Sequence, residues 1–285
     1  RLVQNDVYEN HQGVCVWGHG CAVLDRCKIH DNAGPGVVIM ADGKPSLENV
    51  VIKDNAQQGV LVYNGGAGSF VGCEVSGSGM ANVEVHTLGN PVFTRCDLHA
   101  GQREGVLVQK GGKGVFEHCD VHHNNGCGVA VLGDPTPETE EKHDEDDSNP
   151  SFNANQIRNG KAFGVMCTHE GRGVFEDNDI HHNERAGVFI STGGNPTMRG
   201  NFIHDGLREG ILVDDHGRGV ISRNVIYQNL HSGVGVSFHS DPVLTDNTIR
   251  NGCGEGVWVG DNGKGILEEN DIHENGGGEV HISTY

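Results

Sequence analysis

Glycine and apolar residues return every 23 residues along this chain. A Gly-Val or Gly-Ile pair marks each repeat, at Gly13, Gly36, Gly59, Gly105, Gly128, Gly164, Gly187, Gly210, Gly233 and Gly256. Asn82-Val83 and Glu279-Val280 keep the register without the glycine. A fixed period in this range predicts a solenoid, in which successive turns stack around one continuous core.

Three short strands are predicted in each repeat. With the glycine as position 0, positions 1 and 3 are nearly always Val or Ile, as in Val60 and Val62. Further strands are expected at positions 10–12 and 14–17, and position 16 is aliphatic throughout. Period-two alternation is typical of strands. The predicted fold is therefore all-β: a right-handed parallel β-helix of 23-residue turns, about 11 turns long.

Position 14 should point inward, like position 16. It holds Cys27, Val50, Cys73, Cys96 and Cys119, and then Asn155, Asn178, Asn201, Asn224, Asn247 and Asn270. A buried amide is costly unless it is hydrogen-bonded, so the asparagines predict a ladder in which each side chain bonds to those of neighbouring turns. The cysteines are interpreted as small buried apolar residues and not as disulfides.

Two further positions alternate between turns, which makes the true unit 46 residues long. Position 9 alternates proline with glycine, as in Pro196 and Gly219. Position 19 alternates asparagine with glycine, as in Asn183 and Gly206. Both Asn and Gly tolerate the left-handed backbone conformation, so position 19 is predicted to form a sharp corner.

The chain is expected to form one β-helix domain over residues 1–285 and to be an excerpt of a longer protein. Solenoids need caps at their open ends, so we expect flanking domains or partner proteins to cover both ends. One insertion, at residues 134–147, is acidic and lacks apolar residues. It is interpreted as a solvated loop, with docking to a basic partner as the alternative.

Composition narrows the classes of partner. The formal net charge of −19 argues against nucleic acid, whose phosphates would be repelled. Polyanionic sugars are disfavoured for the same reason unless a local basic patch exists. No apolar run approaches the roughly 18 residues of a membrane span. The nine cysteines lack CxxC spacing, and each potential glycosylation sequon contains proline, so an intracellular location, cytoplasmic or nuclear, is expected.

Segments such as 194–206 and 263–275 resemble the CASH-type β-helix repeats of carbohydrate-binding proteins and sugar hydrolases. The closest resemblance is to the β-helix domain of F-box-only ubiquitin-ligase substrate adaptors, where it implies substrate recognition without catalysis. No F-box is present in this sequence. The same fold also serves pectate lyases, polygalacturonases and alginate epimerases, and fold alone does not decide among these functions. The Asp-Pro-His-Glu signature expected of the epimerases is absent.

Few residues depart from the repeat in a way that suggests catalysis. Gly18-His19-Gly20 occupies a corner that other turns fill with similar residues, so it is interpreted as structural. Histidines recur at position 17, but only His99 with His122, and His181 with His204, lie on neighbouring turns, and neither a metal nor another cofactor is predicted. The catalytic candidates cluster at the first corner of three turns: Asp214, Asp215, His216, His239 and Asp261.

The remaining departure is apolar. Positions 2 and 4 of the first strand should face solvent, yet they are largely hydrophobic. This stripe predicts an interface with another protein or with a missing part of the same chain, formed by Trp17, Val38, Met40, Leu61, Tyr63, Leu107, Leu132, Met166, Phe189, Leu212 and Trp258. Sugar stacking would instead need interleaved polar residues, and only Glu84, His86 and Gln109 supply them.

Two functions from different classes follow. The leading prediction is a non-catalytic β-helix scaffold for protein recognition or assembly, which includes substrate recognition in a ubiquitin ligase. The alternative is a polysaccharide-active enzyme, whether lyase, hydrolase or epimerase, or a carbohydrate-binding domain. A groove with converging carboxylates or a bound cation would favour catalysis, whereas a flat apolar face buried by protein would favour the scaffold.

Overall fold

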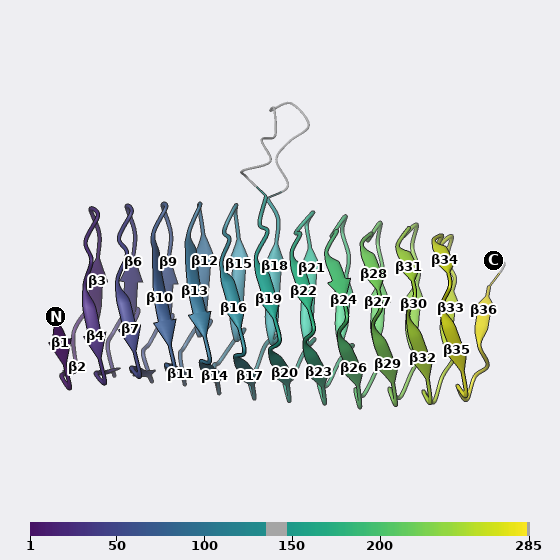
Figure 1. Ribbon diagram of the computed structural model, residues 1–285, viewed down its shortest axis with the longest axis horizontal. Coiled ribbons are helices and arrows are strands. Elements are labelled where there is room, and N and C mark those ends of the chain that lie inside the picture. The colour runs from purple at the N-terminus through teal and green to yellow at the C-terminus, as the bar shows by residue number, and fades with distance from the viewer. Residues whose placement is uncertain (135–146, 284–285) are drawn as a thin grey trace, which may run out of the picture.

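The computed structural model describes residues 1–134 and 147–283. Over these residues 36 strands and no helix form three parallel sheets of 12 strands each. Neighbours within a sheet are three strands apart in chain order, because every turn contributes one strand to each sheet (Figure 1). We name the sheets A, B and C in the order in which the chain first enters them.

Sheet A consists of β1 (Leu2–Val3), β4 (Val23–Asp25), β7 (Ser46–Glu48), β10 (Ala67–Val71), β13 (Asn90–Thr94), β16 (Val115–Glu117), β19 (Ser151–Asn153), β22 (Val174–Glu176), β25 (Thr197–Arg199), β28 (Val220–Ser222), β31 (Val243–Thr245) and β34 (Ile266–Glu268). Sheet B consists of β2 (Asp6–Tyr8), β5 (Lys28–His30), β8 (Val51–Lys53), β11 (Glu74–Ser76), β14 (Asp97–His99), β17 (Asp120–His122), β20 (Gln156–Arg158), β23 (Asp179–His181), β26 (Phe202–His204), β29 (Val225–Tyr227), β32 (Thr248–Arg250) and β35 (Asp271–His273). Sheet C consists of β3 (Val14–Val16), β6 (Val37–Ile39), β9 (Val60–Val62), β12 (Val83–His86), β15 (Val106–Gln109), β18 (Val129–Leu132), β21 (Val165–Thr168), β24 (Val188–Ile190), β27 (Ile211–Val213), β30 (Val234–Val236), β33 (Val257–Val259) and β36 (Val280–Ile282).

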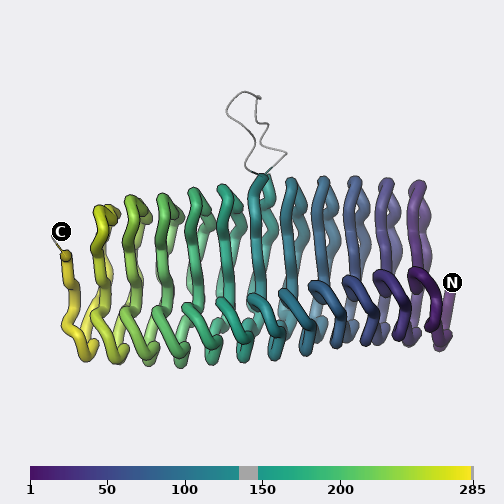
Figure 2. The backbone as a smooth tube through the Cα atoms, turned by 180° about the vertical axis from the view of Figure 1, so that it is seen from behind, coloured from purple at the N-terminus to yellow at the C-terminus, as the bar shows by residue number. Residues whose placement is uncertain are grey.

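The predicted fold is confirmed. The solenoid has about 12 turns, of which those from β3 to β35 are complete, and β1, β2 and β36 belong to partial turns at its two ends. Strand pairing advances by one repeat, as in Val60 opposite Val83. The turns stack side by side into a rod with the two termini at opposite ends (Figure 2).

The core is a set of stacked columns, one for each inward position of the repeat. Away from the two end turns, Val and Ile at positions 1, 3 and 16 are fully buried. Position 11 adds a column of stacked rings, with centroids 4.2 to 5.2 Å apart, from Phe70, Phe93, Phe116, Phe152 and Phe175. In-register stacking of identical side chains therefore fills the interior along much of the rod.

The asparagine ladder at position 14 is confirmed. Asn224 Nδ2 donates to Asn247 Oδ1 at 3.0 Å and to the carbonyl of Met198 at 3.0 Å. Its Oδ1 accepts from both the backbone and the side-chain nitrogen of Asn201, each at 2.9 Å. Every bonding group of this buried amide is thus paired. The four cysteines at the same position are buried and free, as predicted.

The interpretation of position 19 is wrong. The left-handed residue at this corner is position 18, for example Asp205 with φ 51° and Asn251 with φ 55°. Position 19 instead forms a second set of buried amide bonds: Asn124 Oδ1 accepts from the backbone of Gly101 at 2.9 Å, and Asn124 Nδ2 donates to the carbonyl of Leu98 at 3.1 Å.

Glycine and asparagine are in close contact where they alternate at position 19. A Cβ on Gly101 would lie 3.1 Å from Asn124 Oδ1 and 3.0 Å from Asn82 Nδ2. The alternation is not obligatory, since Asn32 and Asn55 occupy this position in consecutive turns and Asn32 Nδ2 donates to Asn55 Oδ1 at 2.9 Å. Position 0 is constrained by the same amides, since a Cβ on Gly105 would lie 2.7 Å from Asn124 Nδ2. Asn82, which stands where other turns have glycine, donates from Nδ2 to Asn124 Oδ1 at 3.0 Å.

The described part of the chain contains no helix long and apolar enough to cross a membrane. The predicted acidic insertion, apart from its first and last residues, lies outside the described residues.

Replacing Asn224 with leucine should lower the melting temperature. The change removes the hydrogen-bond partner of four buried groups: the backbone N–H and the side-chain amide of Asn201, Asn247 Oδ1 and the carbonyl of Met198. We expect the free energy of unfolding to fall by on the order of 3 kcal/mol. Thermal unfolding followed by circular dichroism measures it. Cys96→Val is the matched control at the same position, where Val50 already occurs, and should change little. Equal melting temperatures for the two variants would contradict a structural ladder.

Candidate functional site

The predicted catalytic cluster lies on exposed corner tips. Asp215 Oδ1 is 3.1 Å from His216 Nδ1, and the rings of His216 and His239 stack at 5.3 Å. The hydrogen bond from His216, and then that from Thr192, lower the pKa of Asp215. Asp215, His216 and His239 all have positive φ, so these positions serve the turn geometry.

The other two members of this cluster are less closely involved. Asp214 accepts a bond from Ser237 Oγ at 2.8 Å. Asp261 lies two turns from Asp215 and is exposed. The cluster remains a prediction, and all of its members are at least partly exposed to solvent.

The apolar stripe lies on the outer face of sheet C but is not a continuous bare surface. Trp17 is 66% exposed, whereas Val38 is buried and the other members are half-buried. Small buried residues interrupt the stripe at Ala130 and Gly235, and a polar centre interrupts it at Glu84. Whether a protein or a flanking domain covers this face stays a prediction.

Glu84 is a carboxylate held within this face. It projects from β12 and is only 8% exposed. Gln58 Nε2 donates to one carboxylate oxygen at 2.6 Å, and Gln109 Nε2 donates to the other at 2.9 Å. Gln58 comes from the corner before β9 and Gln109 from β15, so three different turns fix the carboxylate. Because both of its oxygens accept amide hydrogen bonds, the Glu84 carboxylate is held in one orientation.

The same centre contains an unsatisfied acceptor. Gln58 is 7% exposed, and its Oε1 is buried without a hydrogen-bond partner. A buried orphan acceptor is costly, and such exceptions call for an explanation such as an absent water or ligand. The corner between strands gave no sequence signal for this role, so sequence reasoning missed Gln58.

A stacked pair of rings adjoins Glu84. Tyr63, from the corner after β9, stacks on His86 at 5.1 Å with an interplanar angle of 18°. Tyr63 Oη donates to Met40 Sδ at 2.8 Å, and His86 Nδ1 is 2.9 Å from Thr87 Oγ1. Burial lowers the pKa of His86 from its ordinary value of 6.5; Glu84 opposes this shift and Lys110 reinforces it. His86 is therefore neutral at neutral pH.

A hollow of about 340 Å³ lies farther along the same face. Phe163, Arg185, Arg208, Glu209 and Leu212 are among its lining residues. Phe163 stacks on Phe189 at 4.5 Å, and the Arg185 guanidinium lies 5.4 Å from the centre of the Phe163 ring. Within the described residues neither Arg185 nor Arg208 forms an ion pair, so both guanidinium groups can bind an anion.

The family model described as "Right handed beta helix region" matches residues 1–141 and 143–285. No curated protein matches the sequence. Among solved structures, the chain is similar to the A-module of mannuronan C-5 epimerase AlgE4 from Azotobacter vinelandii. Identity is 14% and the TM-score 0.61, over 100% of this chain and 88% of that one.

Two further solved structures are similar. The AlgE6 A-module of mannuronan C-5 epimerase from the same organism has 12% identity and a TM-score of 0.54, over 99% of this chain and 90% of that one. The Agl-KA catalytic domain has 10% identity and a TM-score of 0.50, over 92% and 62%. At such identities the likeness establishes the fold. The predicted β-helix resemblance is confirmed in this general form, and none of these proteins is an F-box adaptor.

The leading functional prediction, a non-catalytic scaffold, is corrected by these comparisons. The two similar structures that cover 99% and 100% of this chain are both modules of mannuronan C-5 epimerases. This favours the alternative of a polysaccharide-active protein. The physical reason for the error lies in the stripe. Its apolar residues were expected to be bare, whereas all except Trp17 are buried or half-buried, and the polar centre at Glu84 interrupts them.

The pKa of His86 should respond in opposite directions to its two charged neighbours. Lys110→Met removes a positive charge and should raise the pKa, whereas Glu84→Gln removes a negative charge and should lower it further. Titration of the His86 ring signals by NMR measures both shifts. The same direction of shift in the two variants would show that the surrounding charges are misassigned.

Proposed function

The chain belongs to the family of right-handed β-helix regions, and we propose that it is a polysaccharide-active enzyme whose substrate lies along the outer face of sheet C. The observation that carries this proposal is the polar centre of that face. There Glu84, fixed by two amides, and the orphan acceptor of Gln58 adjoin the Tyr63–His86 ring pair. Sugars combine apolar ring faces with hydroxyl groups, and this centre offers partners for both.

Binding would use two kinds of contact. The stacked rings of Tyr63 and His86 supply a flat surface for the apolar face of a sugar ring. Gln58 Oε1 would accept a hydrogen bond from a sugar hydroxyl, which would satisfy the acceptor that is buried and unpaired. A few fixed polar groups within an apolar face are typical of small-molecule sites.

The chemistry that this site supports best is proton abstraction next to a carboxylate. A neutral imidazole can accept a proton, and burial keeps His86 in that form. In a uronate sugar His86 would take the C5 proton, and the electron pair would delocalise into the adjacent carboxylate. Return of a proton to the opposite face inverts C5, whereas expulsion of the C4 oxygen cleaves the chain and leaves a C4–C5 double bond.

Nearby groups suit the other needs of that reaction. Lys110 adds positive charge beside His86, where charge develops on the substrate carboxylate. The Tyr63 hydroxyl lies on the ring stacked against His86; it would supply a proton on leaving Met40 Sδ, to which it donates. Hydrolysis is supported less, because it uses paired carboxyl groups and both oxygens of Glu84 already accept amide bonds.

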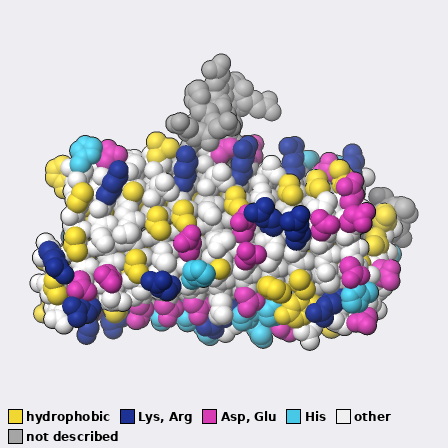
Figure 3. All heavy atoms as spheres, in the orientation of Figure 1, with side chains coloured by type: hydrophobic (Ala, Val, Ile, Leu, Met, Phe, Trp, Pro, Cys, Tyr) yellow, Lys and Arg dark blue, Asp and Glu magenta, His cyan; other side chains and the backbone are white. Residues whose placement is uncertain are grey.

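The net charge of −19 does not exclude an acidic polysaccharide, because charge is unevenly distributed. Lys and Arg side chains stand among Asp and Glu on the face drawn in Figure 3. Arg185 and Arg208, in the corners before β24 and β27, have no ion-pair partner among the described residues and line the hollow beside Phe163 together with Glu209. They would bind carboxylates farther along a polyuronate chain. These two guanidinium groups would serve as the local basic patch that an acidic polysaccharide requires.

His86→Ala should abolish proton exchange at C5 of a polyuronate. Wild-type protein in deuterium oxide is incubated with alginate, polygalacturonate and a neutral glucan, and deuterium at C5 is followed by NMR. We expect exchange with at least one polyuronate, a loss of at least ~100-fold in His86→Ala, and no change in His118→Ala, an exposed histidine at another corner. In the wild type, activity should fall as the pH drops through the depressed pKa of His86, since the protonated ring accepts no proton.

Two results would overturn the proposal. One is the absence of C5 exchange in the wild type with every polyuronate. The other is exchange at the wild-type rate in His86→Ala, which would show that a different group removes the proton.

A further inference from the structure

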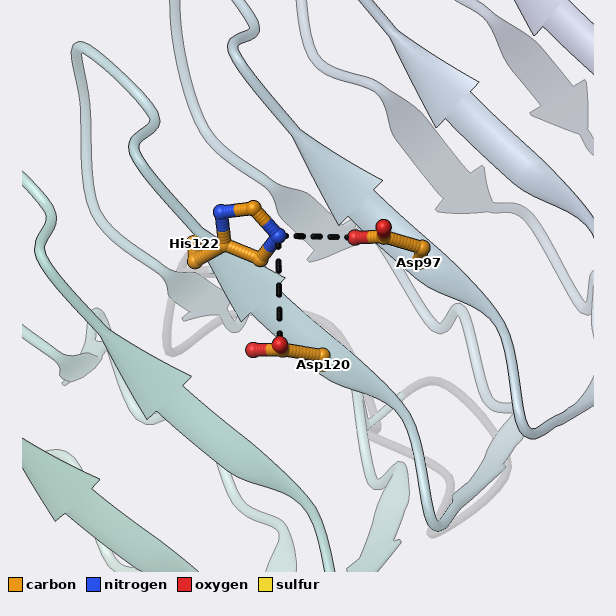
Figure 4. A group of neighbouring side chains, drawn as sticks. All are labelled: Asp97, Asp120 and His122. Atoms are coloured by element: carbon orange, nitrogen blue, oxygen red, sulfur yellow. Dashed lines mark hydrogen bonds and ion pairs between the residues drawn. The ribbon is translucent and has the colours of Figure 1, made fainter.

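Two carboxylates and an imidazole converge on the outer face of sheet B, away from the site on sheet C. His122 Nε2 lies 2.8 Å from Asp97 Oδ1 and 3.8 Å from Asp120 Oδ2 (Figure 4). One potential ligand atom from each of these residues lies within 4.8 Å of the others, the only such group of three among the described residues. Figure 4 shows Asp97 on one strand and Asp120 and His122 on the next.

The repeat itself brings these side chains together. Positions 15 and 17 point outward on sheet B, and the register of β14 and β17 sets Asp97 beside Asp120 and His99 beside His122. The two histidine rings stack at 4.9 Å with an interplanar angle of 2°. The His122 side chain is 15% exposed. Its ring is therefore held in place before any ligand arrives.

The second nitrogen of His122 belongs to a chain of hydrogen bonds that can run in either direction. His122 Nδ1 is 2.7 Å from His123 Nδ1, and His123 Nε2 is 3.2 Å from Asn159 Nδ2. An imidazole can donate or accept at either nitrogen, and an amide can turn over. In one direction His122 Nε2 donates to Asp97. In the opposite direction, His122 Nδ1 donates to His123, and the lone pair of Nε2 faces the carboxylates of Asp97 and Asp120. A cation between these three groups would relieve their repulsion.

Two other histidines in the same column lack this option. His204 has Asp205 2.6 Å from Nδ1 and Asp179 2.8 Å from Nε2. His30 is flanked in the same way by Asp31 at 2.6 Å and Asp6 at 2.8 Å. His122 and His181 instead each have an imidazole beside Nδ1, which can accept, as metal-bound histidines require of their outer partners. Of these two, only His122 has two carboxylate oxygens within 4.8 Å among the described residues.

The charge around His122 is incompletely balanced. Arg158 bonds both oxygens of Asp120, at 3.1 and 2.6 Å. Glu74 lies 3.5 Å from His99 Nε2, and Asp97 adds a third carboxylate. Three carboxylates against one guanidinium leave two negative charges when the histidines are neutral. A divalent cation would neutralise them.

We propose that Asp97, Asp120 and His122 hold a divalent first-row transition-metal cation on the outer face of sheet B. A mixed set of one imidazole nitrogen and two carboxylate oxygens suits such ions, whereas Ca²⁺ prefers oxygen ligands alone. The cation would link β14 to β17 and leave coordination positions for water. Sequence reasoning expected no metal, because it weighed the histidine column without the carboxylates at position 15.

Mn²⁺ is a suitable probe, since carboxylate and imidazole groups bind it while the exposed thiols Cys15, Cys21 and Cys253 favour softer ions. The electron paramagnetic resonance signal of free Mn²⁺ reports the amount bound. We expect one strong site per chain in the wild type and a loss in affinity of more than ~10-fold in Asp97→Asn and His122→Gln. Asp179→Asn, at the equivalent position of β23, is the matched control and should bind like the wild type.

Thermal unfolding completes the test, because an ion that binds only the folded chain raises the melting temperature. Mn²⁺ should raise it in the wild type and in Asp179→Asn, and not in His122→Gln. Equal Mn²⁺ affinity in the wild type and His122→Gln would overturn the proposal, and so would the absence of a strong site in the wild type. Neither outcome depends on whether the chain acts on a polysaccharide.

Discussion

Buried amide hydrogen bonds between successive turns are the constraint on which this structure depends. Each asparagine at position 14 from Asn155 to Asn247 bonds both to the next asparagine and to a carbonyl of the preceding turn. Asparagines at position 19 bond a carbonyl and a backbone N–H of the preceding turn at a second corner. Since a buried amide loses much of its stability when a partner is missing, these columns fix the register of every strand between them.

Fixed register turns the outer surface into columns of aligned side chains. A candidate functional site then arises where different residue types occupy the same position on adjacent turns. On sheet C, the carboxylate of Glu84 is held by amides from two other turns and adjoins the Tyr63–His86 rings. On sheet B, aspartates and histidines at alternate positions converge at His122. The interior columns provide rigidity, and the departures on the outer faces provide the chemistry.

The limits of sequence reasoning follow from which interactions are periodic. Strands, core positions and the position-14 ladder could be predicted because each recurs in register. Gln58 could not, because its role depends on a corner that directs its amide to Glu84 of the next turn. The scaffold prediction failed for a similar reason. The hydrophobicity of the stripe is visible in the sequence, but the half-burial of its side chains depends on how the corners pack around sheet C.

The sequence by itself determined the solenoid, its 23-residue turn and its 46-residue alternation, because a repeated pattern of apolar, glycine and asparagine positions is compatible with one stacking of strands. Only the tertiary structure decided which polar residues meet. Asp97 and His122 are 25 residues apart, and Glu84 and Gln58 are 26 apart. Contacts of this kind depend on corner geometry and side-chain direction to within an ångström, which spacing along the chain does not specify.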